Sequence, residues 1–155
     1  MSTETKDMTE GVSTEFNWRG GVIGGAAGSI VMGLLITAMN SPTLAVAIPS
    51  LYTLAPPPSL ALGFVVHIFH GVVLGLVFAG AVGALGIADR TQLIGVGVGW
   101  GVITWAVLAA LIMPLWLSAV GSPASPPFPN FAPPSLLWHV VYGVVLGVVY
   151  SVLDQ

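Results

Sequence analysis

The sequence predicts an all-α fold: an integral membrane four-helix bundle built from a tandem repeat of two-helix hairpins. Three observations support this prediction. The composition is 55% hydrophobic and only 6% charged. Four segments are long and apolar enough to cross a bilayer, which takes about 20 helical residues. A pattern headed by histidine also occurs twice, as "HIFHGVVLGLVFAG" from His67 and as "HVVYGVVLGVVYS" from His139.

The composition predicts that lipid is the main solvent of the chain. A water-soluble domain carries about 25% charged residues, and the few charges present here could not cover the surface of one. The chain also contains no cysteine. Disulfides, iron–sulfur clusters and thiol catalysis are therefore excluded.

Residues 1–17 are predicted to form a disordered tail in the cytoplasm. They begin with the polar, acidic stretch "MSTETKDMTEGVSTE". A secretory signal would instead begin with a basic region followed by an apolar run. A polar stretch of this kind buries too little apolar surface to fold.

Two predicted hairpins follow the tail, a first over residues 18–88 and a second over residues 89–155. No span has Asp, Glu, Lys or Arg in its interior. The predicted spans cover about residues 20–39, 60–87, 92–118 and 135–153.

The basic residues predict the orientation. Lys6 and Arg19 precede the first span, and Arg90 lies in the turn between the second and the third. The connections at about 40–59 and 119–134 contain no Lys or Arg. The excess of basic residues in cytoplasmic loops then predicts a multi-pass protein of the plasma membrane with both termini in the cytoplasm.

The two outer connections hold eleven of the twelve prolines and no charged residue. Because proline commonly marks loops, one interpretation is rigid loops that lie on the lipid headgroups. An uncharged outward face rich in Leu, Ile and Phe is also a candidate interface. Its partner would be another membrane subunit or a second copy of this chain.

The repeat aligns the two halves of the chain at an offset of 72 residues. Between His67 and Val77, seven of eleven positions are identical to those that start at His139. Because two spans separate the copies, both hairpins have the same orientation. The sequence therefore predicts a pseudo-twofold axis along the membrane normal, as in other parallel repeats.

Each histidine heads a stripe of small residues spaced four apart, which places them on one helix face. Such stripes let helix backbones approach closely in lipid. They also leave room beside the helix for a flat ligand. Together with His67 and His139, the candidate pocket residues are His70, Gly71, Gly75, Gly143 and Gly147.

An intramembrane histidine is costly and is therefore a candidate functional residue. In one interpretation, His67 and His139 are the axial ligands of a haem b, because haem iron accepts imidazole. Paired ligands on the second and fourth helices are similar in layout to those of membrane cytochromes b. Those proteins usually carry two histidines per helix, and this chain lacks the second pair.

Two other interpretations stay open. His67, His70 and His139 offer three nitrogens, enough for a zinc or copper ion, or they line a pocket for a quinone or another small ligand. Alternatively, each histidine bonds a backbone carbonyl, Thr or Tyr of a neighbouring helix and only fixes the packing.

The sequence predicts a protein that is not an enzyme. It contains no phosphate-binding loop, nucleophile elbow or zinc-protease motif. It has no basic patch for nucleic acid. No acidic residue lies within a span to couple the movement of protons or sodium ions.

The pattern "GGVIGGAAGSIVMGLLITAM", a proline-containing outer loop and then "H-x-x-H-G-x-x-x-G", partly repeated, resembles a family of small four-span membrane proteins. That family is common in halophilic archaea and is uncharacterised, and some members carry an automatic histidine kinase label. The resemblance implies no established activity.

We therefore expect a small, non-enzymatic integral membrane protein, an accessory or structural subunit of a larger membrane complex or a homo-oligomer. The main alternative is an electron-transfer protein that binds haem b through His67 and His139. A small transporter or channel is the third.

Overall fold

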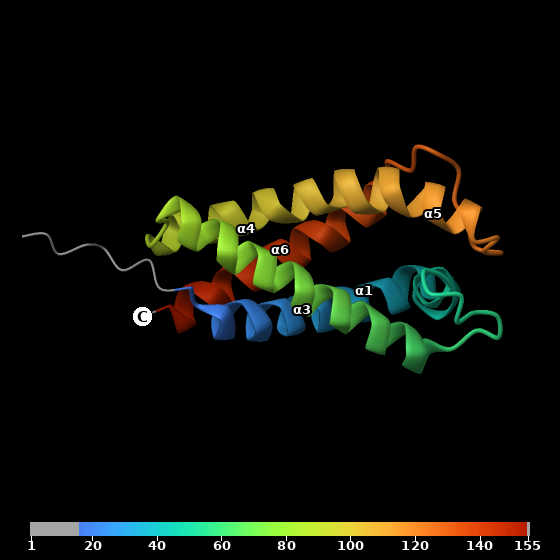
Figure 1. Cartoon of the computed structure of the whole chain (residues 1–155), viewed down its shortest axis with the longest axis horizontal. Helices are drawn as coiled ribbons and strands as arrows, with labels where there is room; N and C mark the ends of the chain where they lie inside the picture. The colour runs from blue at the N-terminus through green and yellow to red at the C-terminus, as the bar shows by residue number, and fades with distance from the viewer. Residues whose placement is uncertain (1–15, 155) are drawn as a thin grey trace, which may run out of the picture.

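The computed structural model describes residues 16–154, and within them the chain is helical with no strand (Figure 1). It confirms the predicted all-α membrane bundle, because four helical stretches are long and apolar enough to cross a membrane. The predicted tail falls mainly on residues 1–15, outside the described part. The four stretches are Trp18–Ser50, Leu60–Leu85, Arg90–Ala119 and Pro133–Leu153.

The first span consists of α1 (Trp18–Pro42), a π-helical segment η1 (Thr43–Ala47) and α2 (Ile48–Ser50). It runs past the predicted end near residue 39. Asn40 leaves the helical conformation (φ −157°, ψ 71°), and the helix starts again directly after it. Pro42 then lies in a first turn, where its missing N–H has no helical partner to lose.

The remaining helices start and end at residues suited to those positions. The Ser59 hydroxyl accepts a hydrogen bond from the N–H of Leu62, and the Asp89 carboxylate accepts one from Gln92. Gly86, with φ +64°, ends the second span in the left-handed conformation that glycine favours. These helices are α3 (Leu60–Leu85), α4 (Arg90–Thr104), π-helical η2 (Trp105–Ile112), α5 (Met113–Ala119) and α6 (Pro133–Leu153).

Two prolines within the helical stretches each leave a backbone carbonyl free, and a residue of the outer connections bonds to it. Pro114 has no N–H to donate to the carbonyl of Ala110, and the backbone N–H of Asn130 donates to it instead, at 2.9 Å. In the first span, Pro49 likewise leaves the carbonyl of Ala45 to the N–H of Ser59, also at 2.9 Å. Backbone groups at membrane depth need such partners.

The helices pack in the order α3, α1, α6 and α4. α1 packs against both α3 and α6, and α6 packs against α4, whereas α3 and α4 meet only sparsely. Figure 1 shows α6 passing between α1 and α4. The bundle is therefore closed on three sides and loosely closed between α3 and the span formed by α4 and η2.

Glycine contacts hold each hairpin together at equivalent positions. A Cβ added to Gly25 would collide with the carbonyl oxygen of Gly71, and one added to Gly97 would collide with that of Gly143. These two pairs differ by the offset of the predicted repeat. The tandem duplication itself stays a prediction, and the matched contacts support it.

The two ends of the bundle are packed differently. We call the end with Asn17, Asp89 and Asp154 the inner end; there, Asn17 Nδ2 donates to Asp154 Oδ1 at 3.0 Å. The inner half is filled by side chains around Phe78, whose ring meets that of Tyr150 edge to face at 5.4 Å. Fully buried side chains in this half include Phe78, Val82, Leu93, Leu146 and Tyr150.

Candidate functional site

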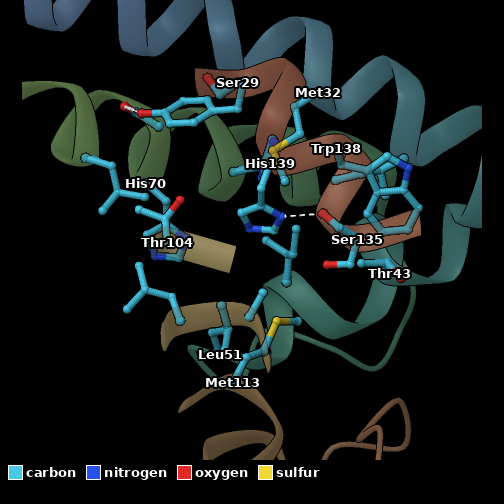
Figure 2. Close-up of a pocket in the computed structure, with 18 of the residues that line it drawn as sticks. Ser29, Met32, Thr43, Leu51, His70, Thr104, Met113, Ser135, Trp138 and His139 are labelled. Carbon is cyan, nitrogen blue, oxygen red and sulfur yellow. Dashed lines mark hydrogen bonds between the residues drawn. The ribbon is translucent and has the colours of Figure 1, made fainter. Parts of the chain in front are cut away.

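All three histidines line a single cavity of about 510 Å³ in the outer half of the bundle. Known small-molecule sites span about 300–1,000 Å³. The walls come from α1, α3, the η2 segment and α6, so both predicted hairpins contribute. Figure 2 shows His70, Thr104, His139 and Met32 around this space.

His139 is oriented by the turn that precedes it on α6. Its Nδ1 lies 2.7 Å from the backbone carbonyl oxygen of Ser135, the bond drawn in Figure 2. A carbonyl only accepts, so Nδ1 is the nitrogen that carries the hydrogen. In the neutral ring, Nε2 is then left as a hydrogen-bond acceptor or a metal ligand.

His67 carries an unsatisfied polar atom. Its side chain is only 8% exposed, and its buried Nε2 has no hydrogen-bond partner among the described residues. Leaving such a group unpaired costs about 1–3 kcal/mol. An orphaned polar atom beside a cavity is therefore a candidate contact for a bound molecule.

His70 lies in the same cavity and is held by the turn that follows the first span. Its Nε2 lies 2.8 Å from the hydroxyl of Tyr52, and the two rings are 5.6 Å apart. Its counterpart in the repeat, Tyr142, also lines the cavity but donates its hydroxyl to the carbonyl of Gly71 at 2.8 Å. The two halves of the site are therefore not equivalent.

The predicted pocket glycines separate into two groups. Gly71 lines the cavity, whereas Gly75, Gly143 and Gly147 are not among its lining residues. Those three instead pack against the backbones of neighbouring helices, at Gly21, Gly97 and Leu93. Close helix packing accounts for these three positions.

The histidines share a cavity without forming a metal triad. Within residues 16–154, no group of three or more His, Cys, Asp or Glu side chains is placed to hold a metal ion. The predicted zinc or copper interpretation therefore has no support in the geometry.

Residues 17–155 match the Family of unknown function (DUF6789). The chain belongs to this family. The match covers all four spans and with them the whole histidine cavity, and it confirms the resemblance to an uncharacterised family. No curated protein and no solved structure matches the chain.

Sequence reasoning did not single out several polar residues of this DUF6789 site. Ser29, Thr104 and Ser135 are all buried at the cavity. The Thr104 hydroxyl donates to its own helix at Trp100 and Gly101. Nothing in the sequence signals the role of Ser135, because every helical histidine has a carbonyl four positions earlier and no such bond joins His67 to Gly63 among the described residues.

The wall of the histidine cavity in the DUF6789 chain is partly exposed on the side of the bundle. Val73 on α3 and Ile112 on η2 line the cavity and are also 41% and 51% exposed on the surface of the bundle. These are the helices that meet only sparsely. On this side the cavity is therefore bounded by aliphatic side chains that are themselves part of the bundle surface.

Proposed function

We propose that this DUF6789 protein is a non-enzymatic membrane protein that binds a neutral, lipid-soluble ligand in the histidine cavity. The observation that carries the proposal is that histidines from both halves of the chain line one cavity. Because part of its wall is exposed between α3 and η2, we infer that it opens to the bilayer there, and we call this side the lateral mouth. A ligand dissolved in the membrane reaches this site without crossing water.

The lining supports a neutral ligand. Among the described lining residues there is no Asp, Glu, Lys or Arg. A charged group buried there would lose its hydration with no partner to replace it, which is strongly unfavourable. The ligand class that fits is therefore uncharged.

The imidazoles support a ligand that carries hydroxyl groups. His139 offers its Nε2 as an acceptor, since its Nδ1 is bonded to Ser135. His67 Nε2 has no partner among the described residues. A hydroxyl group both donates and accepts, so the hydroxyl groups of a quinol, the reduced form of a quinone, can donate to His139 Nε2 and can pair with His67 Nε2 in either tautomer.

The test is native mass spectrometry of the protein released from its own membranes, with organic extraction of any bound molecule. We expect a bound species in the wild type and in Val65→Trp, which adds bulk on the lipid face of α3 away from the cavity. Val73→Trp, on the same helix at the mouth, should lose it. His139→Leu should reduce its occupancy. Equal occupancy in Val73→Trp and Val65→Trp, or an empty wild type, contradicts the proposal.

A haem b on His67 and His139 is a second candidate, favoured by one observation. The bond from His139 Nδ1 to a backbone carbonyl leaves Nε2 free, which is how a histidine ligand of a metal is usually held. Haem bound there would supply one-electron redox chemistry. Against it, the described lining contains no Arg or Lys to pair with the two carboxylates that haem carries.

Haem is distinguished from a neutral lipid by an absorption spectrum. A haem protein gives a Soret band and an α band on reduction, and both disappear in His67→Ala and His139→Ala. If the wild-type protein is colourless but still carries a bound organic molecule, haem is excluded and only the neutral ligand remains as a candidate.

The predicted orientation and the accessory role remain proposals. Arg19 and Arg90 both lie at the inner end, which supports a plasma-membrane protein with its termini in the cytoplasm. At the outer end Phe128 and Phe131 are exposed, and they fit contact with headgroups or with another subunit. An accessory subunit that also binds a ligand satisfies both proposals.

A further inference from the structure

A second cavity lies beneath the outer connection between α5 and α6. Its volume is about 320 Å³, and its walls come from the outer end of the first span, η2, α5 and the segment 124–134. The amide residues Asn40 and Asn130 are in the lining. These groups both donate and accept hydrogen bonds, so this cavity suits water, and we call it the vestibule.

The vestibule adjoins the histidine cavity. Figure 2 shows Thr43, Ser135 and Trp138 together on one side of the histidine cavity, next to His139. The indole N–H of Trp138 donates to the sulfur of Met39 at 3.1 Å, which fixes this ring at the junction. The residues common to both linings are Thr43, Ala109, Met113, Ser135 and Trp138.

Ser135 lies between the vestibule and the imidazole of His139. It lines both cavities, and its carbonyl accepts the hydrogen bond that orients His139. In the opposite direction, the buried side chains around Phe78 and Tyr150 fill the bundle between the histidines and the inner end. Packed side chains therefore separate the histidines from the inner end, and the vestibule lies between them and the outer connection.

We infer that water and small polar solutes reach the three histidines from the outer end, through the vestibule, and not from the inner end. The inference does not depend on which ligand binds or on whether one enters from lipid. The histidine site then exchanges protons and small solutes with the outer aqueous phase alone.

The absence of cysteine from the sequence makes this inference directly testable. Three single variants are reconstituted in sealed vesicles and treated, from each side separately, with a small, uncharged but strongly hydrated methanethiosulfonate, for times too short for it to cross the lipid. Ser125→Cys, exposed in the outer connection, and Gln92→Cys, exposed at the inner end, identify the two sides. Thr104→Cys reports on the histidine cavity alone.

We expect the reagent to modify Thr104→Cys from the side on which it modifies Ser125→Cys, and not from the other side. If the reagent modifies Ser125→Cys but does not modify Thr104→Cys from the same side, the inference is overturned. Modification from the Gln92 side overturns it as well.

A blocking variant separates the vestibule from the lateral mouth. Ala109→Phe fills the junction and should slow modification of Thr104→Cys by about tenfold or more, because a strongly hydrated reagent partitions poorly into hydrocarbon. Val107→Phe, on the lipid face of η2, is the matched control and should leave the rate unchanged. Ala124→Phe, on the loop wall of the vestibule, should slow the reaction as Ala109→Phe does. Equal rates in all of these variants contradict the inference.

Discussion

Single residues in this protein act mainly through the backbone atoms that they approach. His139 is directed by a carbonyl one turn earlier, and Tyr142 ties α6 to α3 through the carbonyl of Gly71. In lipid the backbone has no water to bond, so such contacts gain importance. The glycines show this most clearly, because only a residue without a side chain lets the two helix backbones come this close.

Gly97→Ala should destabilise the protein, whereas Gly99→Ala on the same helix should not. A Cβ at Gly97 collides with the carbonyl of Gly143, and a Cβ at Gly99 meets nothing within 4 Å. We expect a loss of about 1–3 kcal/mol in the free energy of unfolding for the first, as is typical of overpacked cores. Reversible unfolding in mixed micelles measures both variants. Equal stabilities contradict the packing role of this glycine pair.

Tyr142→Phe should weaken the contact between the two hairpins. The variant keeps the ring and removes the hydroxyl that donates to the Gly71 carbonyl. Hydrogen bonds between membrane helices contribute about 0.6 kcal/mol on average, with a maximum near 1.7. We expect a loss of about that size in the same unfolding measurement. A variant as stable as the wild type shows that this bond contributes nothing.

The sequence allowed only part of the residue-level site to be predicted. The repeat identified His67 and His139, and the structure places both on one cavity. It did not distinguish Gly71, which lines the cavity, from Gly143, which packs against Gly97. Both stand four residues after a histidine, and both pack against the partner helix of their own hairpin, so the sequence pattern gives no reason why only Gly71 also lines the cavity.

At the scale of the element, proline has two opposite roles in this chain. In the segment 123–129 it marks a connection, as expected from the sequence. Pro42 and Pro49 instead lie within the helical stretch that continues to Ser50. The sequence could not reveal this, because the freed carbonyl of Ala45 finds its partner in Ser59, beyond the turn.

Pro114→Ala should release the outer connection from η2. The new N–H at position 114 can bond the carbonyl of Ala110, which now accepts from Asn130. We expect the amide of Asn130 to exchange hydrogen for deuterium faster than in the wild type. Pro127→Ala, within the connection, is the control and should leave that exchange unchanged. Unchanged exchange in Pro114→Ala contradicts the role assigned to this proline.

At the scale of the whole molecule, hydrophobic length and charge placement predict four spans, and the structure confirms four helices of that kind. Which helices touch is a different question. The sequence did not predict that α3 and α4 meet sparsely although a short turn joins them. The lateral mouth depends on this arrangement, so it could not be foreseen from the spans alone.

The whole-molecule arrangement also sets the direction of access. A packed inner half, a cavity in the outer half and a vestibule beneath the outer connection give the bundle one closed end and one open end. Close glycine contacts join the helices of each hairpin, and the cavity occupies the space that remains between the hairpins.

The most direct test of the account asks whether His67 and His139 face one cavity. In the cysteine-free chain, the double variant His67→Cys with His139→Cys should be joined within one molecule by a short bifunctional thiol reagent. His67→Cys with Leu137→Cys, whose second thiol faces lipid on the same helix, should not be joined. Intramolecular cross-linking of the first pair alone is the predicted result. No cross-link in the first pair, or equal cross-linking in both, would contradict a shared histidine cavity.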